Sequence, residues 1–483
     1  MASSADNWTF PPTYDKFGIY STKDEDSDNQ KSVDLRSAVQ AFSYYESLFS
    51  PIVTASMSFL ESGTVRFEED NNDTQDRSGT VLDTLPINGK EKVRAIIKHG
   101  SGVLSFDDYP LQVDLVTKGM SASGSQMTHL HMASKFAFDN EEKSVDHRSK
   151  NNIRDSVYNI LKNDLGVPDS RMILEKTQNE LEFPGEGNTP FEIILDLAPV
   201  SKPVRGSAGY FFWETKGGFN FRSIDSLIRQ RPADQYTTDQ DVPSYGAHAN
   251  CRILDYYVVK NEDELTKLRS GVYKSRLSTF NAATQLYDET NYSLTDFSTT
   301  WDAETLGSIP FGDYSAFKSS SDGTVGEFTT YFPSANNGSE QFEKDGDTVK
   351  VSNDEKQHRR VSQMRYISLM TKIMNIVVPA NLKLRAGQIL DLDFVKLTGG
   401  NKNEGADDEK LSGKYIIINL AHKFTREANN AATTHMTVVR DTDGKYIPEV
   451  EDESDETVDE VQQGGNLDLD VVGDFFIPED NIA

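Results

Sequence analysis

Short segments in which apolar and polar residues alternate recur through the first 140 residues. The segments "IVTASMSFLES", "KVRAIIKHG", "YPLQVDLVTKGM" and "THLHMASKFAF" show this period of two, and turns rich in Gly, Asn and Asp separate them. Successive side chains of a β-strand point to opposite faces, so the pattern predicts strands that bury one face. Roughly five or six strands at this spacing predict a small antiparallel barrel or sandwich over residues 31–140.

A second group of strands is predicted near the C-terminus. "CRILDYYVVK" is a strand rich in β-branched and aromatic residues, "IMNIVVPANLKLRAGQILDLDF" gives two more strands around a turn, and "GKYIIINLAHKFTREANNAATTHMTVVRD" is a final hairpin. The charged segment "NDEKQHRRVSQMRYISLMTK" predicts a helix that leads into this group. The fold class predicted is therefore mainly β with α insertions, with two similar antiparallel β-barrels and inserted α/β domains.

The pattern changes to a helical period between the two groups of strands. In "NNIRDSVYNILKNDLGV" the residues Ile153, Val157, Ile160 and Leu161 share one helical face. A second helix is expected to begin at Thr189, since Thr is a good N-cap and Pro190 suits the first helical position.

A hairpin is predicted after these helices. "GYFFWETKGGFNF" gives two strands, and the Gly217 and Gly218 pair is the expected turn of type I′ or II′. The predicted organisation is then a flexible N-terminal arm (1–30), a first β-barrel (31–140), a helical or mixed α+β domain (141–235), a second β-barrel (236–262 and 353–446), an inserted domain (263–352) and an acidic C-terminal tail (447–483).

The charge of the chain is strongly negative and uneven. The formal net charge is −28, and residues 447–483 hold 13 Asp and Glu with no Lys or Arg. Such a surface repels duplex phosphate, so sequence-specific nucleic-acid binding is not expected. Within the acidic tail, the apolar residues Phe475, Phe476 and Ile477 are candidates for a segment that docks on a partner. A solvated tail with incidental apolar residues is an equally good interpretation.

Four histidines could suggest metal chemistry. His129 and His131 lie two apart on one predicted strand, so both point to the same face. His422 and His435 lie on opposite arms of the final hairpin and could pair across it. Zinc sites need three or four protein ligands, and no further ligand is evident beside either pair. Ordinary strand histidines are the favoured interpretation, and no metal site or cofactor is expected.

Nucleophilic and acid chemistry have weak candidates. Cys251 is the single cysteine and is expected to be a small buried residue at the start of a strand, in a reducing compartment. Glu214 beside Trp213 resembles the acid of a glycosidase, but nothing in the sequence places a second carboxylate across a cleft. We therefore expect no catalytic residue. No segment approaches about 18 consecutive apolar residues, and no signal peptide is recognisable at the N-terminus, so neither a membrane span nor a leader is expected.

The order of these elements resembles the baseplate hub proteins of contractile-tailed phages, which are related to the N-terminal region of type VI secretion spike proteins. Three stretches carry the resemblance: the helix from Thr189 with "GYFFWETKGGFNFRSIDSL", the helix that feeds "NIVVPANLKLRAGQILDLDF", and "YIIINLAHKF" with "TTHMTVVRD". Together they cover about 200 residues, and the insertion at 263–352, the loop at 67–79 and both tails have no counterpart.

The resemblance implies a non-enzymatic structural protein with two barrels like those of tail-tube proteins. A homotrimer would present six similar barrels to the sixfold tail tube or its initiator, and true threefold symmetry to the trimeric spike or lysozyme protein. Baseplate wedge proteins would be further partners. The ring would form part of the channel through which DNA passes during ejection, without specific binding. The location implied is the baseplate of the virion, after assembly in the cytoplasm of the bacterial host.

Two alternatives stay open at this point. One is an acidic, β-rich, tail-associated carbohydrate or cell-wall hydrolase that uses Glu214. The other is a component of a secretion-system spike with the same fold.

Overall fold

The computed structural model describes most of residues 11–443 and neither 1–10 nor 444–483. The longer gaps within that span are 23–31, 121–125, 240–249, most of 262–273, 294–302, 311–327, 332–341 and 397–407. The candidate docking residues Phe475, Phe476 and Ile477 lie outside the described residues.

The N-terminal third of the chain forms antiparallel strands, as the period-two pattern predicts. These strands are β1 (Thr13–Tyr20), β2 (Ser32–Asp34), β3 (Val39–Ser47), β4 (Thr54–Glu61), β5 (Thr64–Glu69), β6 (Asp73–Ser78), β7 (Lys92–His99), β8 (Gly102–Ser105), β9 (Leu111–Met120) and β10 (Gln126–Ser134). Their inward residues, among them Phe42, Met57, Val93 and Leu130, form one buried hydrophobic cluster.

Two predictions for this region are corrected by the structure. Residues 13–20 lie within the segment predicted as a flexible arm, yet they form β1, because Phe17 and Ile19 alternate into the core. The strand predicted to run through "KFAF" ends at Ser134, and helix α2 (Lys135–Glu141) follows. Phe136 and Asn140 are its buried residues, and a spacing of four fits a helix rather than a strand.

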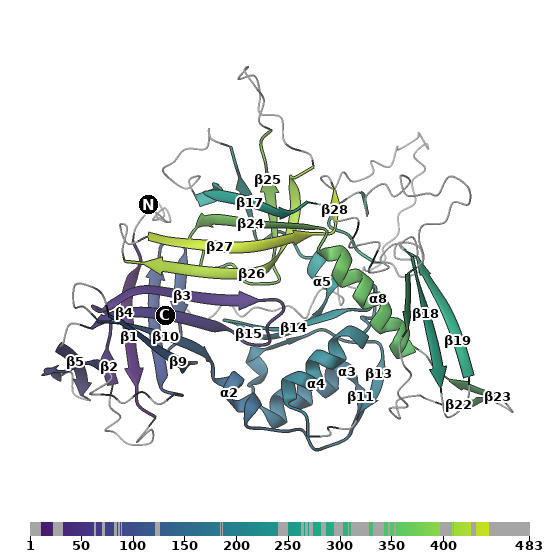
Figure 1. The fold of residues 1–483 in the computed structure, drawn as a ribbon, viewed down its shortest axis with the longest axis horizontal. Helices are drawn as coiled ribbons and strands as arrows, with labels where there is room; N and C mark the ends of the chain where they lie inside the picture. The colour runs from purple at the N-terminus through teal and green to yellow at the C-terminus, as the bar shows by residue number, and fades with distance from the viewer. Residues whose placement is uncertain are drawn as a thin grey trace, which may run out of the picture. The chain divides into compact units, whose positions relative to one another are not determined.

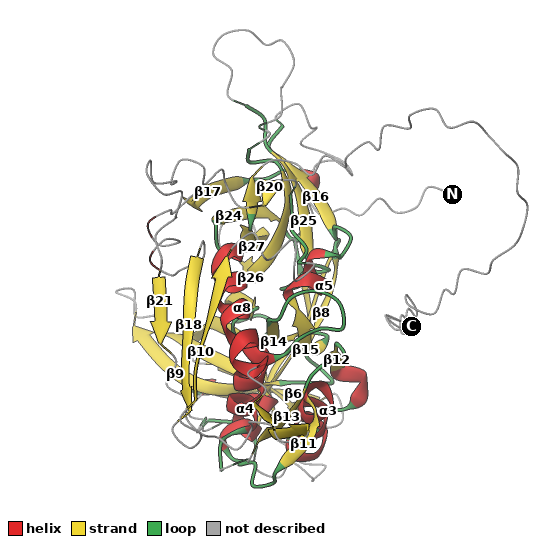
Figure 2. Cartoon of the chain, turned by 90° about the vertical axis from the view of Figure 1, so that its right-hand side faces the viewer, coloured by secondary structure: helices red, strands yellow, loops and turns green. Residues whose placement is uncertain are grey.

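A mixed α and β segment follows the first group of strands, and α3 and α4 lie together with β11 and β13 (Figures 1 and 2). Its elements are β11 (Ser149–Asn152), α3 (Ile153–Asn159), the π-helix η1 (Ile160–Asp164), the 3-10 helix η2 (Asp169–Arg171), β12 (Met172–Leu174), β13 (Glu180–Phe183), α4 (Pro190–Leu197), the 3-10 helix η3 (Ala198–Val200), β14 (Tyr210–Thr215), β15 (Gly218–Ser223) and α5 (Ile224–Ile228).

The helix predictions for this segment are confirmed. Residues Ile153, Val157, Ile160 and Leu161 are all buried in one cluster, as one shared helical face requires. Thr189 caps α4, Pro190 is its first residue, and the Glu192 carboxylate accepts a hydrogen bond from the Thr189 amide at 3.0 Å.

The remaining strands and helix come from the C-terminal half. They are β16 (Asp234–Thr237), β17 (Asp255–Lys260), β18 (Lys274–Asn281), β19 (Leu286–Ser293), β20 (Ile309–Pro310), β21 (Phe328–Tyr331), β22 (Phe342–Asp345), β23 (Thr348–Val351), α8 (Asp354–Leu369), β24 (Lys372–Pro379), β25 (Ile389–Asp393), β26 (Gly413–Thr425), β27 (Ala431–Arg440) and β28 (Thr442–Asp443). Helix α8 and the final hairpin β26–β27 stand where the sequence predicts them.

The two groups of strands belong to one mainly antiparallel sheet of 16 strands. Its path runs β17-β24-β27-β26-β3-β4-β10-β9-β7-β1-β2-β5-β6, so β26 pairs with β3 across a long distance in the sequence (Figure 1). The prediction of a mainly β fold with α insertions is confirmed. The limits of the individual domains stay a prediction, because the β3–β26 pairing makes the two β-units continuous.

A separate hydrophobic cluster lies where the two β-units meet the helices. It joins Leu48 after β3, Trp213 on β14, Leu227 on α5 and Leu369 on α8 to Ile416 on β26. The Trp213 indole also donates a hydrogen bond to the Ala386 carbonyl at 3.2 Å. These contacts hold β14 firmly, and β14 carries the acidic residue that the sequence analysis singled out.

Candidate functional site

Glu46 and Glu214 are two buried carboxyl groups at this junction. Glu46 is the last inward-facing residue of β3, after Phe42 and Tyr44, and Glu214 lies on β14, which is buried along its whole length. Burial raises the pKa of both carboxyl groups, because a charged carboxylate loses its hydration there, and raises that of Glu214 to about 7. The Glu46 position is a signal that sequence reasoning missed, since a charged residue at an inward strand position is uncommon.

Glu46 links three separate parts of the chain. Its carboxylate accepts hydrogen bonds from the Tyr44 hydroxyl at 2.9 Å, the Lys216 amide at 2.9 Å and the Ala386 amide at 2.8 Å. The Arg385 guanidinium lies 3.8 Å away and opposes the rise of its pKa. Every oxygen of Glu46 is thus engaged in holding the β14–β15 turn and the 385–386 segment to β3.

Glu214 has partners of the same structural kind. One carboxylate oxygen accepts a hydrogen bond from the Val53 amide at 3.1 Å, and the other lies 3.5 Å from a terminal nitrogen of Arg171. The Glu214 side chain is buried, with a relative exposure of 1%. A general acid must reach its substrate, and this carboxyl group is held inward by the backbone of the first β-unit.

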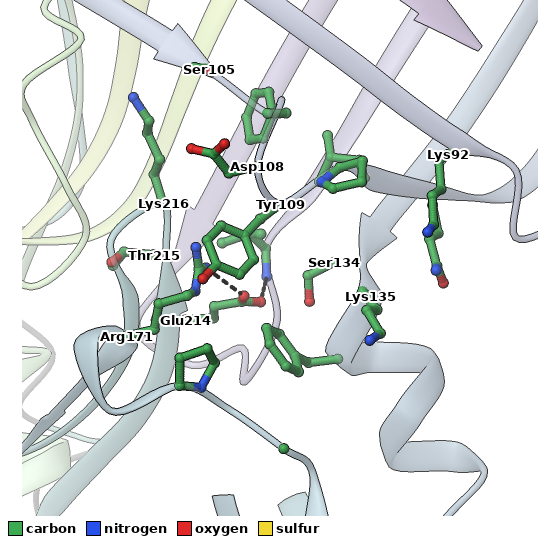
Figure 3. Close-up of a pocket in the computed structure, with 18 residues that line it drawn as sticks. Lys92, Ser105, Asp108, Tyr109, Ser134, Lys135, Arg171, Glu214, Thr215 and Lys216 are labelled. Atoms are coloured by element: carbon green, nitrogen blue, oxygen red, sulfur yellow. Dashed lines mark hydrogen bonds and ion pairs between the residues drawn. The ribbon is translucent and has the colours of Figure 1, made fainter. Parts of the chain in front are cut away.

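A pocket of about 590 Å³ opens over Glu214, between the end of β10, the loop after β8 and the η2 segment. Its charged lining residues are Lys92, Asp108, Lys135, Arg171, Glu214 and Lys216 (Figure 3). The Arg171 guanidinium lies 3.9 Å from the centre of the Tyr109 ring, a cation–π arrangement in which the ring covers one face of the cation. We call this hollow the junction pocket.

Arg171 is the second residue that sequence reasoning missed. It ends the single-turn helix η2, and its side chain is largely buried against Glu214. Nothing in a local pattern marks it, because Glu214 is 43 residues away in the chain. The contact exists because β12, which follows Arg171 directly, pairs in parallel with β15 and so brings Arg171 beside the β14–β15 hairpin.

The histidines of the final hairpin do not face one another. In the register of β26 and β27, His422 is opposite Thr434 and His435 is opposite Ala421, so the two rings point to opposite faces of the sheet. His422 is buried, its Nδ1 lies 3.0 Å from the Thr434 hydroxyl, and burial lowers its pKa to about 3. Of the two structural interpretations, the cross-strand polar pair exists, but with Thr434 as the partner of His422.

The other two histidines lie on the outer face of β10. His131 is exposed, and the Nδ1 atom of His129 lies 2.7 Å from the Ser58 hydroxyl on β4. Across the described part of the chain, no three side chains of His, Cys, Asp or Glu come together as a set of metal ligands.

Cys251 lies four residues before β17 rather than inside it, and it is half-buried. Burial and the nearby Asp234 raise the pKa of its thiol, and both disfavour the thiolate. This environment does not favour a nucleophile. Within the residues that the structure describes, no helix is long and apolar enough to cross a membrane.

A second candidate surface lies at one edge of the large sheet. Among the described strands, β17 pairs only with β24, which leaves its other edge open. Leu254, Tyr256, Tyr257 and Val259 on or beside this strand are exposed apolar or aromatic residues. An open edge with exposed apolar side chains is a common site for association with another chain.

No protein-family model matches the sequence, and no curated protein matches it in a sequence comparison. Comparison with solved structures finds similar folds in two tail proteins. The tail protein from Neisseria meningitidis MC58 is 9% identical with a TM-score of 0.48, and the match covers 89% of this chain and 97% of that one. The 43 kDa tail protein of prophage MuSo2 from Shewanella oneidensis is 10% identical with a TM-score of 0.49, covering 88% and 98%.

A third similar structure is a component of the type VI secretion system from E. coli, 8% identical with a TM-score of 0.38 over 83% of this chain and 73% of that one. The solved structures found are therefore phage tail and type VI spike-related proteins, the group that the sequence resembles. At TM-scores below 0.5 this similarity transfers neither an activity nor a set of partners.

Proposed function

We propose that the chain is a structural hub subunit in the baseplate of a contractile phage tail and that it is not an enzyme. The observation that carries the proposal is the pairing of β3 with β26, which joins two antiparallel β-units edge to edge in one subunit. Three such subunits around an axis present six β-units, so one ring fits a sixfold tube on one side and a threefold spike on the other.

The open edge at β17 supports the homotrimer. Backbone groups on an unpaired edge and the exposed side chains Tyr257 and Val259 offer both hydrogen bonds and apolar area to a neighbouring copy. The partners proposed are two further copies of the chain, the tail tube or its initiator, the trimeric spike or lysozyme protein and the baseplate wedges. The place proposed is the tail baseplate of the virion, after assembly in the host cytoplasm.

The net charge of −28 supports a role in the DNA channel. A lumen that carried many Lys and Arg would bind phosphate and slow the passing DNA, whereas an acidic wall does not. The channel is part of the proposal and needs no sequence-specific contact with DNA.

The oligomeric state is the direct test of the hub. Light scattering of the purified chain, alone and with the spike protein of the same phage, is expected to give a trimer or a complex with three copies of this chain. A stable monomer that gains no mass with the spike protein would contradict the proposal. Assembly with a secretion spike in place of a tail spike would favour the secretion-system alternative.

The hydrolase alternative has one observation in its favour, which is the pKa of about 7 for Glu214 beside a pocket. Against it stand the burial of Glu214 and its bonds to Val53 and Arg171. The assay is release of reducing sugar from purified cell wall by the wild type and by Glu214→Gln. Release that the substitution abolishes, in a variant with unchanged melting temperature, would establish an enzyme.

A further inference from the structure

We propose that the junction pocket binds an acidic peptide segment of a partner protein. This goes beyond assembly of the ring, and it would hold whether the chain is a trimer or a monomer. The pocket measures about 590 Å³, within the usual range of ligand sites, and is built from β10, η2 and β14 rather than from one surface loop.

The charge of the junction pocket is opposite to that of the chain. Four basic residues line it against two carboxyl groups, Asp108 and Glu214, whereas the whole chain carries −28. Glu214 lies on the floor and is already bonded to the Val53 amide. Lys135 and Lys216 lie on either side of Arg171 in Figure 3, so an incoming anion meets a cation from more than one direction.

Arg171 is oriented to take a carboxylate. Tyr109 covers one face of its guanidinium, and Glu214 is 3.5 Å from only one of its terminal nitrogens. Among the described residues its buried Nε has no hydrogen-bond partner. A buried N–H without an acceptor costs roughly 1 to 3 kcal/mol, and a ligand carboxylate would remove that cost.

Gln112 points to a peptide rather than a simple anion. Its side chain lines the junction pocket with a relative exposure of 9%, and its Oε1 finds no donor in the part of the chain that the structure describes. This oxygen requires an N–H or O–H donor, which succinate and fully ionised phosphate lack. A peptide backbone supplies N–H groups, and its Asp or Glu side chains supply carboxylates. An acidic peptide therefore satisfies both Arg171 and Gln112.

The test is calorimetric titration of the full chain with capped hexapeptides. The probes are acetyl-(Glu-Asp)3-amide, its neutral counterpart acetyl-(Gln-Asn)3-amide, succinate and inorganic phosphate. We expect saturable binding of the acidic peptide only, weakening as salt is added. Arg171→Gln and Lys135→Gln should each weaken it by about tenfold.

Lys98→Gln is the matched control. Lys98 and Lys135 have similarly exposed side chains, 57% and 60%, and each pairs with an aspartate, but only Lys135 lines the junction pocket. Lys98→Gln should bind the peptide like the wild type. If Arg171→Gln fails to fold, Lys135→Gln decides, because its exposed side chain is not needed for folding.

Three results would overturn the proposal. The acidic peptide could show no saturable binding, succinate or phosphate could bind as tightly as the peptide, or Lys98→Gln could weaken binding as much as Lys135→Gln. The second result would reduce the junction pocket to a general anion site, and the third would reduce the effect to overall charge. None of these results bears on the oligomeric state, so the hub proposal is tested separately.

Discussion

Glu214 couples the protonation of one carboxyl group to the folding of the junction. Its pKa is about 7 in the fold against an ordinary value of 4.5. The folded state therefore binds this proton more tightly than the unfolded chain does. The stabilisation is complete below pH 4.5 and is lost as the pH rises toward 7.

Replacing Glu214 by Gln is expected to remove this dependence on pH. Gln keeps an oxygen for the Val53 amide and does not titrate. At about 1.4 kcal/mol per pKa unit, the unfolding free energy of the wild type relative to the variant should fall by about 3 kcal/mol between pH 4.5 and pH 8. Urea unfolding at pH 4.5, 6 and 8 measures this difference. Parallel pH profiles of the two proteins would show that Glu214 does not titrate as described.

His422 has the opposite sign. Its pKa is lowered to about 3 from an ordinary value of 6.5, so the unfolded chain takes up a proton that the folded chain refuses. The stability is complete above pH 6.5 and is lost as the pH falls. For the wild type relative to His422→Gln, the loss between pH 7 and pH 5 should be about 2 kcal/mol. His131→Gln, which changes an exposed residue, is the control in the same urea titration and should follow the wild type.

At this scale the sequence predicts the kind of residue better than its partner. The period of two correctly places His422 on a strand of the final hairpin, but the one-residue register that sets Thr434 opposite it depends on the whole sheet. Glu214 is recognisable as unusual beside Trp213. Its partners Val53 and Arg171 come from other elements, so neither follows from a local pattern.

The β14–β15 hairpin shows what local sequence does and does not decide about an element. The two strands form as predicted, but the connecting residues are Lys216 and Gly217, one position earlier than the expected Gly217 and Gly218. Gly218 is already the first residue of β15, with a φ of +126°, and a Cβ there would lie 2.2 Å from the Arg171 carbonyl oxygen. The turn is therefore shifted by a contact with η2 that the hairpin sequence does not contain.

Substitution of these two neighbouring glycines separates the contact from the turn. Gly218→Ala should lower the unfolding free energy by roughly 2 to 4 kcal/mol, because it combines an unfavourable φ with a backbone collision. Gly217→Ala should cost roughly 1 kcal/mol or less, since its nearest atom is the Thr215 hydroxyl oxygen at 3.6 Å. Thermal melting of both variants gives the comparison. Equal effects would mean that the Arg171 contact does not constrain the turn.

The whole molecule depends on a sheet that no single stretch of sequence encodes. The core of the first β-unit includes Leu382 and Phe424 from the second, and Arg426 donates hydrogen bonds to the Arg36 and Ser37 carbonyls at 2.9 and 2.8 Å. Alternating patterns predict each unit as a barrel of its own. They contain no information on which outer strands meet, because pairing between strands far apart depends on the shape of both units.

Association through β17 is expected to be sensitive to charge on that strand. Val259→Asp should shift the chain from trimer to monomer in analytical ultracentrifugation while its melting temperature changes by only a few degrees, because Val259 is 50% exposed. Val204→Asp is the matched control, with an exposure of 71% at a site away from β17. A trimer that survives Val259→Asp, or one that Val204→Asp dissociates equally, would place the interface elsewhere.

The pairing of β3 with β26 also sets a timetable for synthesis. Ser47 and Asn419 lie opposite each other in the two strands but are 372 residues apart in the chain. At usual translation rates the ribosome needs about 20 to 75 s to add that length. Throughout this interval the nascent β3 has one edge without its final neighbour, and an open edge invites pairing with the wrong strand. The newly made N-terminal unit therefore needs protection, by chaperones or by a slow pace of its own folding, until the last hairpin leaves the ribosome.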